Sequence, residues 1–222
     1  NYAISGSVRS RGGIAVCSSI EHHAVLDPVL HHGGVTVSVT RDGQVDIDTL
    51  RQVLDGVISS GQHIAVVSVM AVNNEVGSIN DIVAVAAVVR EVAPEAWLQT
   101  DAVQAACWVE LSQISRHVDL LSLSAHKFGG PKGVGLTVVS NGATPEPLLL
   151  GGGQERGRRS GTIDVAGAVG AATALEKTTS ERDVMSQRVL SLRNELLDAL
   201  VQIEGVVETV SREHTVPGIA HI

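Results

Sequence analysis

Short apolar runs alternate with longer segments of helical pattern along most of the chain. This alternation is typical of a parallel sheet whose strands are connected by crossover helices. Several runs have the length and composition of strands, the last of them directly after a Gly-Pro-Lys-Gly turn. The predicted strands are Ile14–Ser18, Val35–Thr40, Ile64–Val69, Trp97–Thr100, Leu120–Ser124 and Val134–Val139.

Segments of helical pattern lie between these strands. The predicted helices are Ala24–His31, Ile47–Leu54, Asp81–Val92 and Gln113–His117. By composition Ile82–Val89 would also suit a strand, but Asp81 is a good N-cap, and the alanines and the pair Arg90-Glu91 favour a helix. Pro28 is awkward within the first helix, because it has no N–H to donate, and could shorten that helix to a turn.

The pattern changes after residue 164. Ala166–Glu176 is alanine-rich and helical, and Glu181–Val201 repeats apolar residues among charged ones as a long amphipathic helix does. A strand is predicted next, at Val206–Val210. We therefore predict a larger α/β domain in residues 1–164 and the beginning of a smaller α+β domain in residues 165–222.

Composition narrows the possible partners. Apolar residues make up 44% of the chain and charged residues 18%, which allows a buried core and excludes overall disorder. The net charge of -8 and the 2% of aromatic residues argue against direct contact with nucleic acid. No apolar run approaches the roughly 18 residues of a membrane-spanning helix, so we predict no membrane partner.

The cysteines and the two ends of the chain bear on its location. Cys17 and Cys107 lie in apolar stretches and are interpreted as buried free thiols, which favours a reducing, cytoplasmic compartment. The chain opens with Asn1 instead of Met and closes without a polar tail. Both ends look cut, so we expect the middle of a longer protein, and the lack of a signal peptide says nothing about export.

Polar clusters follow four of the predicted strands at their carboxyl ends. In an open parallel sheet, this edge is where ligands bind. Any one cluster could be an ordinary turn or helix cap, but their convergence on one edge indicates a site. The clusters are Ser18–His23, Asn73–Gly77, Thr100–Gln104 and Ser124–Lys127.

The residue types in these clusters suit pyridoxal phosphate, and we predict no metal site. Lys127 follows a buried strand and can form a Schiff base with an aldehyde. Asp101 can pair with a protonated ring nitrogen, and such an opposite charge holds the proton by roughly 1–3 pKa units. A flat imidazole, His22 or His23, could stack on the ring. The other candidate ligands are Asn74 and Gln104 for a ring hydroxylate, and Ser124 and His126 for a phosphate.

Five segments, in order, resemble the motifs of the cysteine desulfurases, in the class V branch of the fold-type I pyridoxal-phosphate enzymes. The resemblance covers essentially the whole chain. It implies the fold of that type, a mostly parallel sheet with flanking helices followed by the start of a smaller α+β C-terminal domain. The segments are Glu21–Asp27, Asn73–Gly77, Asp101–Gln104, Ser124–Lys127 and Gly151–Thr162.

The resemblance also implies a role for each matching residue. Lys127 matches the Schiff-base lysine, which also acts as the base at Cα, and Asp101 matches the partner of the ring nitrogen. His22 matches the histidine stacked on the ring and is expected to be catalytic together with Lys127. The other cofactor-binding matches are Gln104 and Asn74 near the ring hydroxyl, Ser124 and His126 at the phosphate, and Thr162. In the family the matching threonine reaches the phosphate of the other subunit's cofactor, which implies a homodimer.

Several neighbours of these residues have two interpretations. Glu75 could orient Asn74 or cap a turn. Lys132 is expected to shape the turn in which it lies rather than to touch substrate. The arginines of the glycine-rich segment, Arg156, Arg158 and Arg159, could be solvated or could contribute to an interface or a phosphate site.

By resemblance, the complete protein is a pyridoxal-phosphate-dependent cysteine desulfurase. Such an enzyme converts L-cysteine to L-alanine and passes the sulfur to one of its own cysteines as a persulfide, for iron–sulfur scaffold proteins or tRNA thiolation. In the family that cysteine lies beyond the position of Ile222, and neither Cys17 nor Cys107 matches it, so we expect this chain alone to be inactive. The alternatives are another class V enzyme, such as a selenocysteine lyase or an aminotransferase, and a non-catalytic protein that binds the cofactor.

Overall fold

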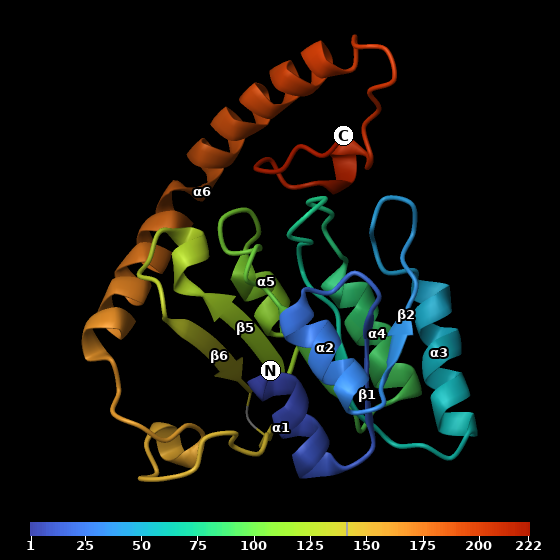
Figure 1. Ribbon diagram of the computed structural model, residues 1–222, viewed down its shortest axis with the longest axis vertical. Helices are drawn as coiled ribbons and strands as arrows, with labels where there is room; N and C mark the ends of the chain where they lie inside the picture. Colours follow the sequence, from blue (N-terminus) through green and yellow to red (C-terminus); the bar gives the residue numbers. More distant parts are fainter. Residues whose placement is uncertain (141) are drawn as a thin grey trace.

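A mostly parallel sheet organises the part of the chain that the computed structural model describes, residues 1–140 and 142–222 (Figure 1). Its strand order is β2-β1-β3-β4-β5-β6, and neighbouring strands are parallel except for the antiparallel pair β5 and β6. This topology confirms the predicted α/β class. The strands are β1 (Ile14–Ser18), β2 (Val35–Val37), β3 (Ile64–Ser68), β4 (Trp97–Asp101), β5 (Leu120–Ser124) and β6 (Gly135–Val139).

Helices cover both faces of this sheet. Along β1, Ala15 and Cys17 pack with α1 and α2, whereas Val16 packs on the opposite face with α3 and α4. Because both faces are buried, the central strands are continuous apolar runs rather than alternating ones. The helices are α1 (Tyr2–Arg11), α2 (His23–His31), α3 (Ile47–Ser59), α4 (Ile82–Val92), α5 (Leu111–Ser115) and α6 (Val165–Leu200), with 3-10 turns η1 (Ala125–Phe128), η2 (Glu155–Gly157) and η3 (Arg212–His214).

The strand predictions are confirmed for the sheet, and one prediction outside it is wrong. Predicted and observed ends of the sheet strands agree within a residue, except that β2 ends at Val37, because Thr40 already closes a turn with Gln44. The predicted strand Val206–Val210 is not a strand. Its first residue closes a turn back onto Ile203, and no ladder of hydrogen bonds joins this segment to another strand in the described part of the chain.

The helix predictions hold, with changes at several ends. Asp81 caps α4 as predicted, its side chain accepting from the Ala84 N–H at 2.9 Å. The expected shortening at Pro28 does not occur, because the Ala24 carbonyl, which loses its helical donor to the proline, accepts from the Asn1 nitrogen at 3.0 Å. The two helices predicted after residue 164 are one continuous helix, α6.

The long helix α6 connects the sheet to the end of the chain. It passes beside η1 in its first half, where the Thr178 hydroxyl donates to the Phe128 carbonyl at 3.0 Å, and then extends past the sheet (Figure 1). The chain then turns back, so that Val216 is buried in the same core cluster as the strands. The division into two domains at residue 164 stays a prediction. No helix in the described residues combines the length and apolar character needed to cross a membrane.

Candidate active site

The sheet order brings the four polar clusters together. Their strands, β1, β3, β4 and β5, are consecutive neighbours in the sheet and run in the same direction. The clusters therefore line one edge of the sheet, at the carboxyl ends of its central strands. This is the position where open α/β sheets bind ligands.

Asp101 is the buried acid of this edge. It is the last residue of β4 and is only 7% exposed, and its Oδ1 accepts from the Val103 N–H at 2.9 Å. Burial raises the pKa of Asp101, whereas the Val103 N–H and the nearby His22 act in the opposite direction. A positive charge beside a buried acid stabilises its carboxylate form, so Asp101 is placed to hold a cationic group.

His22 is held at the start of α2. It is the N-cap residue, and its Nδ1 accepts from the Ala24 N–H at 3.0 Å. A ring whose Nδ1 accepts a hydrogen bond carries its proton on Nε2 when neutral. The ring is exposed and close enough to Asp101 to affect its pKa. It can therefore present a flat face toward a ligand bound beside that carboxylate.

Lys127 lies on the short turn η1 that follows β5. The turn begins after Ser124, whose hydroxyl is 2.9 Å from the His126 Nδ1, and ends at Gly129 with a φ of 82°. Lys127 and His126 are exposed, and the Lys127 ammonium makes no hydrogen bond or ion pair with another described residue. The Lys127 amine is therefore accessible to a ligand, with the Ser124 hydroxyl and the His126 ring beside it as possible donors to a phosphate.

The loop after β3 carries Asn74, and hydrogen bonds of the neighbouring Asn73 side chain fix its conformation. The buried Asn73 Oδ1 accepts from the Glu75 and Val76 N–H groups, each at 2.9 Å, and its Nδ2 donates to the Ile20 carbonyl at 3.0 Å. Asn74 is half-buried with no hydrogen bond from its amide to another described residue, and the same holds for Gln104. Both amides remain available at this edge, whereas Asn73 shapes the loop.

Glu21 is a residue of this edge that the sequence interpretation did not assign. It is 6% exposed, and its Oε1 accepts from the Ser18 hydroxyl at 2.8 Å and from the Met70 N–H at 2.7 Å. Burial raises the pKa of Glu21 to about 8, against the effect of these two hydrogen bonds and in the same direction as that of the nearby Asp101. An acidic residue three positions after a serine at the end of an apolar strand is the signal that could have indicated it.

Thr162 is not brought to this edge within the chain. Because β6 runs antiparallel to β5, the segment that follows it, Gly151–Thr162, starts from the opposite edge of the sheet. In Figure 1 that yellow-orange segment lies past one end of β6, and η1 lies at the other end of this strand. Thr162 is exposed there. The structure places the other predicted ligands together and leaves Thr162 apart.

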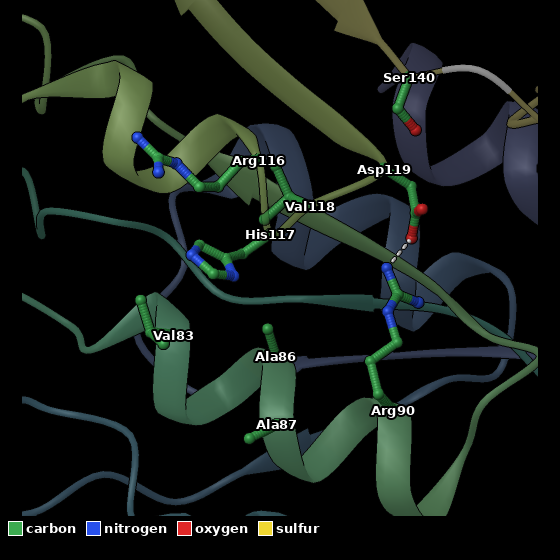
Figure 2. Close-up of a pocket in the computed structure, with 9 residues that line it drawn as sticks. All are labelled: Val83, Ala86, Ala87, Arg90, Arg116, His117, Val118, Asp119 and Ser140. Atoms are coloured by element: carbon green, nitrogen blue, oxygen red, sulfur yellow. Dashed lines mark hydrogen bonds and ion pairs between the residues drawn. The ribbon is translucent and has the colours of Figure 1, made fainter.

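A surface pocket of about 410 Å³ lies at the opposite edge of the sheet, before β5 (Figure 2). None of the predicted site residues lines it. Two charged side chains that line the pocket form an ion pair with each other, since Arg90 Nη2 donates to Asp119 Oδ2 at 2.7 Å. The pocket is therefore separate from the candidate active site.

The residues at the carboxyl edge fit pyridoxal phosphate. A buried acid suits its ring nitrogen, an exposed primary amine suits its aldehyde, and the hydroxyl and imidazole pair of Ser124 and His126 suits its phosphate. The sheet and this set of residues together define the class of fold-type I pyridoxal-phosphate enzymes. The sequence profile of the family described as Aminotransferase class-V matches residues 2–221. The chain belongs to the class V aminotransferase family, whose enzymes use pyridoxal phosphate.

The similar proteins are cysteine desulfurases and NifS-like proteins. The chain is 38% identical over 212 residues to the cysteine desulfurase IscS of Methanosarcina thermophila, covering 91% of the chain and 50% of that protein. A solved NifS-like protein superimposes with a TM-score of 0.89 at 34% identity, covering 97% of the chain and 60% of the other. SspA, solved in complex with cysteine, gives a TM-score of 0.68 at 30% identity, covering 79% and 51%. The chain spans about half the length of the curated relatives it matches.

Proposed function

We propose that this chain is the cofactor-binding part of a pyridoxal-phosphate-dependent cysteine desulfurase, which converts L-cysteine to L-alanine and transfers the sulfur to an enzyme cysteine. The observation that carries the proposal is that the buried Asp101, at the end of β4, and the exposed Lys127, in the turn that follows the neighbouring β5, lie at one edge of the sheet. The similarity to IscS and NifS-like proteins and to SspA bound to cysteine supports this choice of reaction.

The bound cofactor would supply an electron sink for a substrate Cα that loses its proton. In this chain, Lys127 would link to the cofactor and hold or move the proton at Cα. Asp101 would keep the ring nitrogen protonated, and His22 would stack on the ring. The remaining ligands would be Gln104 and Asn74 at the ring hydroxyl, Ser124 and His126 at the phosphate, and Thr162 at the phosphate of the partner subunit in a homodimer.

The cysteines of this chain are poorly suited to accept the sulfur. Cys17 is buried within β1, and burial raises the pKa of its thiol to about 12. The Cys107 thiol donates to the Lys127 carbonyl at 3.3 Å, and burial raises its pKa as well. Since the thiolate is the reactive form of cysteine, we propose that the acceptor cysteine belongs to another part of the protein. Both cysteines are free thiols, which supports a cytoplasmic location, with an iron–sulfur scaffold or another sulfur acceptor as partner.

Lys127→Ala in the full-length protein tests this proposal. We expect the variant to lose the visible absorbance band of covalently bound cofactor, because no other predicted ligand supplies a primary amine. Borohydride reduction should fix the cofactor on the peptide that contains residue 127 in the wild type only. Cysteine-dependent alanine release should fall by at least about 10²-fold, the smallest contribution expected of a general base.

The matched control is Lys132→Ala, which removes an exposed lysine of the same glycine-rich segment. It should keep the absorbance band and the alanine release. A Lys127→Ala variant that keeps its band, or a wild type that binds no cofactor, contradicts the proposed site. Cofactor binding without alanine release from cysteine contradicts the proposed reaction and favours another class V activity.

A further inference from the structure

Glu21 connects two of the strands that form the candidate active site. It lies in the turn between β1 and α2, and its Oε1 accepts from the Ser18 hydroxyl at the end of β1 and from the Met70 N–H just after β3. A second contact, from Asn73 Nδ2 to the Ile20 carbonyl at 3.0 Å, joins the same two segments. Glu21 directly precedes His22, so these contacts fix the turn that carries the His22 ring.

The surroundings of Glu21 disfavour a negative charge. Its Oε2 is buried with no hydrogen-bond partner among the described residues, and no ion pair of the described residues includes Glu21. The charge of Asp101 on β4 raises the pKa of Glu21, and the charge of Glu21 in turn raises the pKa of Cys17 on β1. Neither Asp101 nor Cys17 is a cation that could stabilise a negative charge on Glu21. A fully buried carboxylate with two donors and an acidic neighbour is more stable with a proton.

We propose that Glu21 is a positioning residue that, as an uncharged carboxylic acid, fastens the turn carrying His22 to the end of β3. Its Oε1 serves as the acceptor that joins the strands, and the carbonyl oxygen of a neutral carboxyl group keeps this capacity to accept. Of the two acidic residues at this edge, Asp101 then carries the charge that pairs with a cationic ligand. The role of His22 in this proposal rests on the proposed function, whereas the state of Glu21 does not.

The first test compares urea unfolding of the cofactor-free wild type and Glu21→Gln across pH. Glutamine keeps the acceptor and cannot ionise. An unfolded glutamate ionises near 4.5, whereas folded Glu21 has a pKa of about 8. The native state therefore holds the proton longer, and the wild type loses stability as pH rises between these two values. We expect the unfolding midpoint of the wild type to fall relative to that of Glu21→Gln across this window and the difference to stay constant above it.

Two results overturn this part of the proposal. Parallel pH profiles of wild type and Glu21→Gln mean that folded Glu21 ionises like an exposed glutamate. A Glu21→Gln protein that does not fold means that the acceptor alone is insufficient. Both results are read without cofactor, so they are independent of whether the proposed function is correct.

The second test asks whether Glu21 acts through His22. Glu21→Met retains the length of the side chain and removes the acceptor, whereas Glu21→Gln retains it. We expect Glu21→Met to weaken cofactor binding at least tenfold and to reduce the visible circular dichroism of the bound cofactor as His22→Ala does, with Glu21→Gln within about twofold of wild type. Because both residues act on one contact, the double variant Glu21→Met/His22→Ala should lose little beyond His22→Ala.

Additive losses in the double variant, or wild-type binding and dichroism in Glu21→Met, overturn the positioning role. If Glu21→Met does not fold, Ser18→Ala replaces it, since it removes one of the two donors to Oε1 and leaves the backbone contact in place. It should shift the dichroism in the same direction by a smaller amount. An unchanged dichroism in a folded Ser18→Ala protein is then the contradicting result.

Discussion

The direction in which the pKa of Asp101 is shifted depends on whether a cationic ligand is bound beside it. Without a ligand, burial raises its pKa, so acid protonates it at a higher pH than it protonates an exposed aspartate. A cationic ring nitrogen needs the carboxylate form, and binding must then expel the proton. We therefore expect cofactor affinity to be highest above the raised pKa of Asp101 and to fall up to about tenfold per pH unit below it, as measured by absorbance titration.

Asp101→Asn separates this effect from other titrations. The variant should bind cofactor more weakly and lose the acid limb of the profile, because asparagine has no proton to gain. Asp55→Asn, on the exposed surface of α3, is the matched control and should leave the profile unchanged. An acid limb that persists in Asp101→Asn would assign it to another group.

Single residues also show what the sequence could and could not predict. The polar clusters could be placed on one edge in advance, because parallel strands that alternate with helices end on the same side of a sheet. The sequence could not predict which member of each cluster is buried and which is exposed. Asn73 shapes its loop and Asn74 is left available, and Glu21 is buried beside the exposed His22. These distinctions depend on turn geometry that neighbouring strands impose.

At the scale of a single helix, replacing glycine by alanine is expected to change the free energy of unfolding in opposite directions at Gly56 and Gly167. In the first turn of α6, a Cβ on Gly167 would lie 2.7 Å from Val134 Cγ2 and would collide with the capping carboxylate of Asp164. In α3, Gly56 is exposed with nothing within 4 Å of the added carbon. Gly56→Ala should raise the free energy of unfolding by about 0.5–1 kcal/mol. Gly167→Ala should lower it by about 1 kcal/mol or more, through loss of the cap.

Chemical denaturation of both variants measures this difference. Alanine is the better helix former at either position, so the sign reversal comes from the neighbours of Gly167, the side chain of Val134 and the capping carboxylate of Asp164. A stabilised Gly167→Ala would show that the start of α6 can move away from Val134. The long helix itself illustrates the same limit of sequence reasoning, since the polar stretch between Glu176 and Glu181, which separated two predicted helices, lies within the continuous α6.

At the scale of the whole molecule, the chain after α6 returns to the candidate active site. The Ile79 N–H donates to the His214 carbonyl at 2.8 Å, and the Val216 N–H donates to the Gly77 carbonyl at 2.9 Å. The loop that carries Asn74 is therefore paired with residues about 140 positions later. Sequence pattern predicted a strand, Val206–Val210, in this region, because the local apolar run was visible and the distant partner was not.

Arg193 anchors this returning segment. It is 5% exposed, and its Nη1 donates to the Thr215 hydroxyl at 2.9 Å and to the Val216 carbonyl at 2.8 Å. Hydrogen bonds to a charged group contribute about 1.5–3 kcal/mol. In Arg193→Met, hydrogen exchange of the Ile79 and Val216 amides should accelerate about 10- to 100-fold, because local opening becomes easier by that amount.

The amide of Ala102, which is bonded to the Ser122 carbonyl within the sheet, should be protected as before. Arg188→Met is the matched control, since Arg188 is an exposed arginine of the same helix. It should leave all three amides unchanged. Uniform acceleration in Arg193→Met would mean that the arginine stabilises the molecule as a whole. Acceleration restricted to the returning segment and the Asn74 loop would show that α6, through Arg193, holds the segment around Thr215 against the loop that carries Asn74.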